Sequence, residues 1–343
     1  SNGRGGGVIQ GTASEAVLVA MCAARAAAER RGGERGGLVA YCSSQAHSSV
    51  TKAAMIAGIG RDAVRVVDVD DRLAMRAEAL REAIREDRAA GRAPLFVCAT
   101  LGTTSSGAVD PLDGIAVIAR EEGAWLHVDA AWLGAAFVCP ELRGPLAGVE
   151  RADSFNFNPH KWLLTNFDCS ALWVADRAPL LEALSIMPEY LRNAASDANA
   201  VIDYRDWQIP LGRRFRALKL WFVIRHYGVE GLRAHIRASI AMAERFEALV
   251  RADERFEIAA PRSAALVCFR LRGEDGLSRR LVEAINASGR AFITHTALPD
   301  PERPGESRYV IRFAIGGVNT RPEHIEETWG EMQRAADAIA PRG

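Results

Sequence analysis

The 343-residue sequence contains almost no lysine: Lys52, Lys161 and Lys219 stand against forty arginines. It also has no net charge at pH 7, since 43 basic side chains balance 43 acidic ones. A balanced chain has no overall electrostatic attraction to nucleic acid or to an anionic membrane. We therefore expect a small-molecule substrate, with neither nucleic acid nor a membrane as a partner.

Paired cysteines and long apolar runs are absent as well. The six cysteines form no C-x-x-C pair and most lie in apolar segments, which predicts buried free thiols in a reducing compartment. The seven histidines show neither H-x-H nor H-E-x-x-H spacing, so the sequence predicts no zinc site. There is no apolar run of about 18 residues to span a membrane, and no signal-peptide pattern. We predict a cytoplasmic protein without a bound metal.

Predicted strands alternate with predicted helices up to about residue 180. A glycine-rich segment, GRGGGVIQGT, is predicted as a loop, and a strong helix follows over 14–31 with Ser14 as its N-cap. Alternation of this kind is typical of a mostly parallel sheet with helices on both faces. The predicted strands cover 37–43, 64–69, 94–100, 125–131, 153–158 and 170–176, and further helices are predicted near 48–58, 73–90 and 111–122.

The pattern changes near residue 187. Residues 187–203 are small, polar and weakly periodic, which predicts a mobile loop. Two helices are predicted next, from 213 to 227 and from 229 to 250, separated by Gly228, and the remainder has the pattern of a smaller α+β domain. We therefore predict a large domain over 1–220 and a small C-terminal domain over 221–343.

Lys161 lies in the segment FNFNPHKWLLTNF, where most residues are apolar, aromatic or small. Burial disfavours the charged form of a lysine and lowers its pKa, so the neutral amine becomes a nucleophile able to form a Schiff base with a carbonyl. The alternative is a lysine whose ammonium reaches solvent from the end of an apolar strand. The local sequence favours neither interpretation.

Three more features carry candidate chemistry. Two of them, Asp129 and His47, follow predicted strands, where the chemistry of parallel sheets collects, and the third lies at the start of the first predicted helix. Asp129 ends WLHVDAA, and its carboxylate either faces a protonated ring nitrogen such as that of pyridoxal phosphate or caps the next turn. The hydroxyl of Ser14 and the backbone N–H groups of Ala13 and Ser14 either bind a phosphate or form an ordinary helix start. His47, in SSQAHSS, either stacks on a flat ring or serves as a plain hydrogen-bonding group. The glycine spacing matches neither a dinucleotide fingerprint nor a P-loop.

Several segments together resemble the aromatic L-amino-acid decarboxylases, which are group II pyridoxal-phosphate decarboxylases with the aspartate-aminotransferase-like fold. The resemblance runs from about residue 5 to about residue 235 and continues more loosely through 294–296 and 309–317. NPHKW is highly specific, because we expect a serine in place of His160 in histidine decarboxylases and a different sequence around the lysine in glutamate decarboxylases. An aromatic substrate is therefore favoured. The segments that carry the resemblance are GVIQGTASEA, QAHSSV, ATLGTT, WLHVDAAW, ADSFNFNPHKWLL, NFDCSALWV and DYRDWQIPLGRRFRALKLWFV.

The resemblance implies a role for each matching residue. Lys161 corresponds to the Schiff-base lysine, Asp129 to the partner of the pyridine nitrogen, and His47 to the histidine that stacks on the cofactor ring. Phosphate-side contacts are implied for Ala13, Ser14 and Asn158, with His160 beside the phosphate. Thr104 matches a threonine that contacts the cofactor, and Ala131 an alanine that packs against its ring.

Two further positions are implied to control the reaction. Tyr190, in IMPEYLRN, matches the proposed proton donor of the family, and relatives with phenylalanine there are oxidative aldehyde synthases. The alternative is a helix-end tyrosine packed on the surface. Gly212, in PLGRRF, matches a position where plant relatives use glycine for indole substrates and serine for phenolic ones; the alternative is an ordinary glycine at a helix start.

The resemblance implies decarboxylation of an aromatic L-amino acid (tryptophan, tyrosine, DOPA or a phenylalanine-like acid) to its amine and CO₂. It also implies a homodimer, in which a long segment before the glycine-rich stretch clasps the partner subunit and helps line the substrate pocket. This sequence contains no counterpart of that segment, so either upstream residues lie outside it or the natural protein is short. The alternative functions are an aminotransferase or aldehyde synthase on the same scaffold, and a truncated non-catalytic relative.

Overall fold

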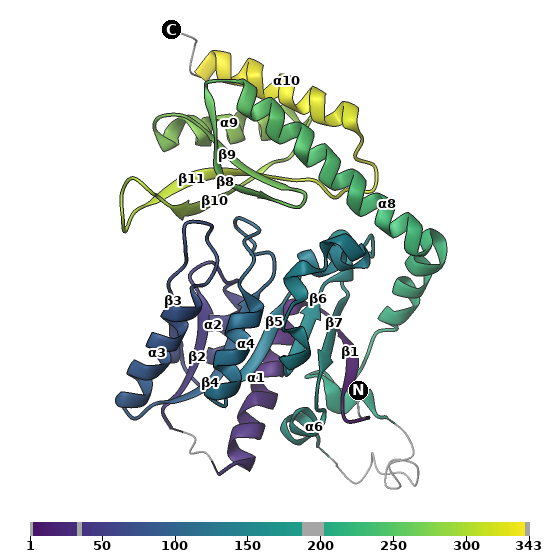
Figure 1. The fold of residues 1–343 in the computed structure, drawn as a ribbon. Helices are drawn as coiled ribbons and strands as arrows, with labels where there is room; N and C mark the ends of the chain where they lie inside the picture. The colour runs from purple at the N-terminus through teal and green to yellow at the C-terminus, as the bar shows by residue number, and fades with distance from the viewer. Residues whose placement is uncertain (1–2, 33–35, 187–201, 340–343) are drawn as a thin grey trace.

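The computed structural model describes residues 3–32, 36–186 and 202–339, and it contains two units that are each built on one β-sheet. The large unit has a seven-stranded sheet. The small unit has a four-stranded sheet and lies above the large unit in Figure 1. The predicted fold class, a mostly parallel α/β unit followed by a smaller α+β unit, is confirmed.

The sheet of the large unit is mostly parallel. Strands β6, β5, β4, β2 and β3 run parallel, whereas β7 pairs antiparallel with both β6 and β1. All six strands predicted for this unit are present, and β1 is added at one edge. The strand order is β1 (Gly6–Gln10), β7 (Ser170–Val174), β6 (Ser154–Phe157), β5 (Trp125–Asp129), β4 (Ala93–Thr100), β2 (Leu38–Ser43) and β3 (Val64–Val67).

Helices cover both faces of this sheet, because its central strands are apolar on both sides. In β2, Val39 and Tyr41 pack in the same core as α3 and α4, whereas Ala40 and Cys42 pack in the core that contains α1. The alternation follows the two-residue period of a strand. The helices are α1 (Ala13–Arg30), α2 (Ser49–Ile56), α3 (Ala77–Ala89), α4 (Leu112–Glu121), α5 (Pro159–Trp162) and α6 (Ala178–Leu184).

The glycine-rich segment that was predicted as a loop forms strand β1 instead. A Cβ atom at Gly6 would lie 3.0 Å from Cζ3 of the buried Trp207 ring, and one at Gly7 would lie 2.8 Å from Cδ1 of Trp173. Contacts this close exclude a side chain at Gly6, where Trp207 is buried, and would force the exposed Trp173 ring to shift at Gly7. The glycines are therefore needed because two indole rings lie against the strand, and the loop prediction was wrong because glycine was taken as a sign of a turn.

Substitution of Gly6 by alanine is expected to lower the free energy of unfolding by about 1–3 kcal/mol, because the added methyl group overlaps the Trp207 ring. Chemical denaturation of the purified variant measures this loss. Gly276→Ala is the matched control, since a Cβ atom at that position in α9 (Asp275–Ser288) meets nothing within 4 Å. Equal stability of the two variants would contradict the explanation.

The small unit has an antiparallel sheet with helices on the side away from the large unit (Figure 1). Its helices are the second part of α8 (Arg216–Ala252), α9 and α10 (Pro322–Ile339). Helices α8, α9 and α10 pack on the sheet and on one another. The strand order is β10 (Thr294–Pro299), β11 (Ser307–Ala314), β9 (Leu266–Leu271) and β8 (Phe256–Ser263).

Gly228 divides α8 into two parts. Its backbone angles, φ 60° and ψ −179°, are not helical, so two helices meet at a kink there. A positive φ is readily adopted only by glycine, and the two helices predicted on either side of Gly228 are confirmed. The proposed domain boundary between residues 220 and 221 lies within the first of them.

The small unit is attached to the large unit through Ser105, in the loop that follows β4. Thr296 Oγ1 donates a hydrogen bond to Ser105 Oγ at 2.8 Å, and Arg312 Nε donates to the Ser105 carbonyl oxygen at 3.1 Å. The thiol of Cys268 lies 3.4 Å from the same oxygen. These contacts hold the small sheet over the carboxyl ends of the parallel strands, where the predicted site residues lie.

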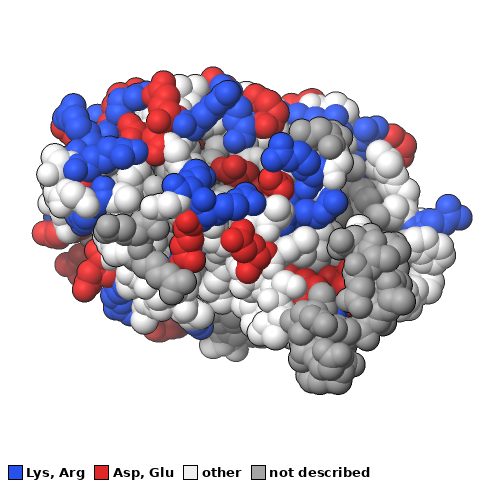
Figure 2. Space-filling view, turned by 90° about the horizontal axis from the view of Figure 1, so that it is seen from below, with Lys and Arg blue, Asp and Glu red and all other residues white. Residues whose placement is uncertain are grey.

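The distribution of charge on the surface and the state of the cysteines agree with the expectations from the composition. Acidic and basic side chains are interspersed on the face of the large unit that Figure 2 shows. Among the described helices, none is long and apolar enough to cross a membrane. All six cysteines are free, and all but Cys22 are buried.

Candidate active site

Asp129 and Lys161 lie at the same edge of the large sheet. Asp129 is the last residue of β5, and Lys161 lies in α5, the short helix directly after β6. Strands β5 and β6 are parallel neighbours, with Asp129 opposite Asn156. Because the carboxyl ends of parallel neighbours meet at one edge, the carboxylate and the amine point toward one region.

Within the described residues, one carboxylate oxygen of Asp129 is hydrogen-bonded and the other is not. Oδ1 accepts hydrogen bonds from the backbone N–H of Ala131 at 3.0 Å and from Asn156 Nδ2 at 3.4 Å. Asp129 is 4% exposed, yet no donor in the described part of the chain reaches Oδ2. The carboxylate therefore caps the turn with one oxygen and leaves the other for a ligand, so the two predicted alternatives are compatible.

Lys161 is held through its backbone while its side chain reaches the site. Its N–H donates to the carbonyl of Asn158 at 3.0 Å, and the side chain is exposed. Even so, surrounding protein lowers the pKa of the Lys161 amine below its ordinary value; the charge of Asp129 opposes the shift and that of Arg312 adds to it. The amine is thus both accessible and more often neutral than a free lysine, which combines the two predicted interpretations.

The start of α1 differs from the prediction in one respect. Thr12, and not Ser14, is the N-cap: its Oγ1 accepts from the N–H of Glu15 at 3.3 Å, and Glu15 Oε2 accepts from the N–H of Gly11 at 2.9 Å. Thr12 has the extended backbone that an N-cap requires, which places Ser14 inside the first turn. Among the described residues, none bonds the Ser14 hydroxyl, so it remains available for a phosphate, together with the first N–H groups of the helix.

Asn158 and His160 flank the same region. Asn158 is 2% exposed, and its Oδ1 is buried without a hydrogen-bond partner in the described residues. Nδ1 of His160 accepts from the N–H of Cys169 at 2.8 Å, so the neutral ring carries its proton on Nε2. Burial lowers the pKa of His160, which favours this neutral form. Both side chains thus have hydrogen-bonding atoms left for a bound group.

The other predicted contacts lie at the carboxyl ends of neighbouring strands. His47 is exposed between β2 and α2, and its Nδ1 accepts from the N–H of Ser49 at 3.1 Å. Thr104 is exposed in the loop after β4, and Ala131 follows β5. Strands β2, β4 and β5 are adjacent in the sheet. The fold therefore brings these residues to the edge that carries Asp129 and Lys161.

Of the two remaining predicted residues, the structure describes only Gly212. Tyr190 lies outside the residues that the structure describes. Gly212 is exposed on the connection before α8, and its carbonyl accepts a hydrogen bond from Gln208 Nε2 at 3.1 Å. α8 begins at Arg216, so Gly212 is not the glycine of a helix start. Its φ is not positive, and a Cβ atom there would meet nothing within 4 Å, so neither its backbone nor its neighbours require glycine.

The sequence analysis missed three residues that act on this site. Asn156 and His127 are buried and hydrogen-bonded in line with Asp129, and Arg312 reaches the site from β11. The sequence offered a sign of the first two, because polar residues at alternate positions of a strand lie on the same face. His127 is two positions before Asp129 in β5, and Asn156 lies opposite Asp129 in β6. The sequence gave no sign of Arg312, because its position at the site depends on how the small unit lies over the large one.

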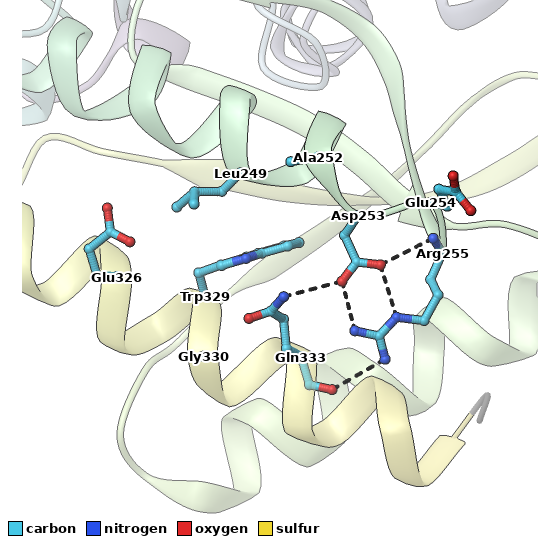
Figure 3. A pocket seen from close by; sticks show the side chains of 9 residues that line it. All are labelled: Leu249, Ala252, Asp253, Glu254, Arg255, Glu326, Trp329, Gly330 and Gln333. Atoms are coloured by element: carbon cyan, nitrogen blue, oxygen red, sulfur yellow. Dashed lines mark hydrogen bonds and ion pairs between the residues drawn. The ribbon is translucent and has the colours of Figure 1, made fainter. Parts of the chain in front are cut away.

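A cavity of about 880 Å³ lies elsewhere, among the elements on the outer side of the small unit (Figure 3). Asp253 accepts hydrogen bonds there from Arg255 and from Gln333 of α10. The Arg255 guanidinium lowers the pKa of Asp253 to about 2. These bonds tie the end of α8 to β8 and α10, and none of the predicted site residues lines this cavity.

Comparison with known proteins identifies the family. Residues 1–272 match the pyridoxal-dependent decarboxylase conserved domain. The chain belongs to this family. It is 51% identical to tryptophan decarboxylase 2 of Oryza sativa subsp. japonica, over 99% of this chain and 69% of the relative. It is 50% identical to the aromatic-L-amino-acid decarboxylase of Bos taurus, over 98% of this chain and 69% of that one.

Solved structures of the family have the same fold. A crystal structure of Oryza sativa TDC with PLP and tryptamine matches with a TM-score of 0.93 and 44% identity, over 98% of this chain and 71% of that one. Catharanthus roseus tryptophan decarboxylase in complex with L-tryptophan matches with a TM-score of 0.90 and 43% identity, over 98% and 71%. The resemblance read from the sequence is confirmed, and so is the cofactor, pyridoxal phosphate.

The residues of this pyridoxal-dependent decarboxylase fit the cofactor chemically. An unused carboxylate oxygen at Asp129 suits a protonated ring nitrogen, and the amine of Lys161 suits an aldehyde. The unbonded Ser14 hydroxyl at the start of α1 suits a phosphate. Among the described residues, none is hydrogen-bonded to any of these three groups, which lie at one edge of the sheet as a site for this cofactor requires.

Proposed function

We propose that this chain decarboxylates an aromatic L-amino acid to the corresponding amine and CO₂, as a pyridoxal-phosphate-dependent carboxy-lyase. One observation carries the proposal: the free oxygen of Asp129 and the amine of Lys161, with its lowered pKa, face one region at adjacent strand ends. Identity of about half to tryptophan, tyrosine and aromatic-L-amino-acid decarboxylases supports the aromatic substrate.

Pyridoxal phosphate, when bound, supplies the electron sink that accepts the electrons left on Cα as the carboxylate departs. The residues of the chain position it. Lys161 would bind its aldehyde, and Asp129 would hold the proton of its ring nitrogen. His47 would stack on the ring, and Ala131 would pack against it. Ser14, the start of α1 and Asn158 would bind the phosphate, with His160 beside it, and Thr104 would make a further contact with the cofactor.

Product analysis tests the reaction. The purified chain, loaded with pyridoxal phosphate, is incubated with tryptophan, tyrosine, DOPA and phenylalanine in turn, and the products are identified by mass spectrometry. Amine and CO₂ in equal amounts are expected. A keto acid would indicate an aminotransferase, an aldehyde would indicate an aldehyde synthase, and absence of visible cofactor absorbance would indicate a non-catalytic relative; each would overturn the proposal.

The same panel tests the preferred ring. We propose that Gly212 leaves room for an indole, so that tryptophan is accepted at least as well as tyrosine. The support is that neither the backbone nor the neighbours of Gly212 require glycine, so nothing in the described part of the fold around it explains the missing side chain. The structures of related tryptophan decarboxylases with tryptamine or L-tryptophan agree with this choice.

Tyr190→Phe is expected to divert the product from amine toward aldehyde, because the variant lacks the phenolic proton that we propose is delivered to Cα. The amine-to-aldehyde ratio with the preferred substrate, measured by mass spectrometry, reports the change. Tyr204→Phe serves as the control, since that tyrosine packs on Trp207 at a ring distance of 5.8 Å, beside β1. An unchanged amine yield in Tyr190→Phe would remove this role.

We also propose that the chain acts as a homodimer in the cytoplasm. The first part of α8 supports the dimer, because its outer side chains are apolar and exposed: Trp221 is 53% exposed and Phe222 57% exposed. Exposed apolar patches of this kind mark association surfaces. Sedimentation equilibrium of the purified chain tests the oligomeric state.

A further inference from the structure

A row of buried polar side chains leads through strands β5 and β6 to Asp129. Trp125 and His127 precede Asp129 at alternate positions of β5, and Ser154 and Asn156 occupy alternate positions of β6. The two strands are paired with His127 opposite Ser154 and Asp129 opposite Asn156. Since alternate residues of a strand share a face, all five side chains lie on one side of the sheet.

Hydrogen bonds join these side chains without a break. Trp125 Nε1 donates to Ser154 Oγ at 2.8 Å, and Ser154 Oγ lies 2.8 Å from His127 Nδ1. His127 Nε2 lies 2.8 Å from Asn156 Oδ1. Asn156 Nδ2 donates to Asp129 Oδ1 at 3.4 Å, the longest of the four. His127 and Asn156 are each 0% exposed, so water does not compete for these bonds.

The two ends of the row determine the direction of every bond in it. The carboxylate of Asp129 can only accept, so Asn156 turns its NH₂ group toward Asp129 and its Oδ1 toward His127. His127 Nε2 must then carry a proton, because it faces an acceptor. Burial lowers the pKa of His127 to about 4, so at neutral pH the ring is neutral and Nδ1 accepts.

The far end completes the pattern. The indole N–H of Trp125 can only donate, so Ser154 Oγ accepts from it and gives its own proton to His127 Nδ1. The other histidine tautomer would place two acceptors against each other at Asn156, and turning the amide would place its oxygen against the carboxylate of Asp129. A buried polar group left unpaired costs about 1–3 kcal/mol, so one arrangement is strongly favoured.

We propose that His127 and Asn156 are positioning residues that set the direction in which the carboxylate of Asp129 presents its unused oxygen to the ring nitrogen of the cofactor. The torsion that orients an aspartate carboxylate is broad and roughly two-fold, so the backbone alone does not determine it. Asn156 and the N–H of Ala131 hold Oδ1, and the bond from His127 holds Asn156. The second oxygen, Oδ2, then has a fixed direction and remains available for the ring nitrogen. This inference rests on the proposed use of Asp129 as the ring-nitrogen partner.

Three variants and one control test the row. Asn156→Leu and His127→Leu remove its hydrogen bonds at similar volume. His127→Gln keeps one donor and one acceptor and is the conservative variant. Phe96→Leu is the matched control, because the Phe96 ring stacks on His127 at 5.6 Å but makes no hydrogen bond in the row. Should a leucine variant fail to fold, Asn156→Ser, whose hydroxyl is too short to bridge His127 and Asp129, replaces it.

Three measurements are made on each purified chain: the dissociation constant of pyridoxal phosphate for the apoprotein, the visible circular dichroism per bound cofactor, and the free energy of unfolding. Both leucine variants are expected to weaken cofactor binding about tenfold, the scale of one lost hydrogen bond to a charged group. They are also expected to reduce the circular dichroism, because the ring is less firmly oriented. His127→Gln is expected to retain most of both signals.

The control separates positioning from general destabilisation. Phe96→Leu is expected to lose stability while keeping cofactor affinity and circular dichroism near those of the unmodified chain. Unchanged affinity in both leucine variants, or an equal loss in Phe96→Leu, would overturn the inference. Failure of the unmodified chain to bind the cofactor or to release an amine would instead count against the proposed function.

Discussion

Lys161→Ala is expected to abolish covalent attachment of pyridoxal phosphate and to reduce amine formation on the order of 10³-fold or more, because no other amine at the site can replace the lost nucleophile. Borohydride reduction of the loaded protein, followed by proteolysis and mass spectrometry, locates the attachment. The chain has only three lysines, so the modified peptide is identified without ambiguity.

Lys219→Ala is the matched control for this variant. Lys219 Nζ lies 3.7 Å from Asp168 in an ion pair, and it is not among the residues proposed to hold the cofactor. The Lys161 side chain is exposed, so its removal leaves the fold intact and activity can be compared at equal stability. Label found on Lys219 or Lys52, or an active Lys161→Ala variant, would show that another group performs the reaction.

The second large effect is expected for Asp129→Asn, which replaces the carboxylate by an amide of the same shape. The amide carries no negative charge and cannot keep the ring nitrogen protonated, so the electron sink is weakened. We expect kcat/KM for the preferred aromatic substrate to fall on the order of 10³-fold, the scale found for residues that act together in a catalytic group. Steady-state kinetics of amine release measures the loss.

Asp110→Asn is an instructive control for Asp129. Asp110 is also a buried aspartate, but both of its oxygens are used: Oδ1 accepts from the N–H of Met75 and Oδ2 from the N–H of Thr100, each at 2.7 Å. Asp110 joins the backbone at Met75 to the end of β4 at Thr100. Asp110→Asn is therefore expected to lower the free energy of unfolding and to leave cofactor affinity unchanged. Weaker cofactor binding in Asp110→Asn than in Asp129→Asn would contradict the distinction between the two carboxylates.

The difference between these aspartates could not be read from the sequence. Asp129 ends an apolar strand and Asp110 lies in the loop after another, and both are flanked by small or apolar residues. What separates them is whether both oxygens meet a backbone N–H, and that depends on how strands and loops from distant parts of the chain lie together. A free carboxylate oxygen is therefore a property of the fold.

Two predictions failed for one reason. β1 was predicted as a loop because it is rich in glycine, and Ser14 was predicted as the N-cap because it precedes an apolar helix. In each case a local rule was applied without the neighbour that decides the outcome: Trp207 lies against Gly6, and Thr12 already caps the helix. By contrast, the division of the helical stretch at Gly228 was predicted correctly, because a glycine with positive φ acts through its own backbone.

The sequence by itself determined the alternation of strands and helices, the positions of Asp129 and Lys161 at strand ends, and the family to which the chain belongs. These depend on apolar periodicity and on short segments, which are local. The tertiary structure alone decided that Asp129 keeps one oxygen free, that Arg312 acts on Lys161 from the small unit, and that His127 and Asn156 lead to the carboxylate. Each of these requires contacts between residues far apart in the chain, because hydrogen bonding and burial are settled only when separate strands and units come together.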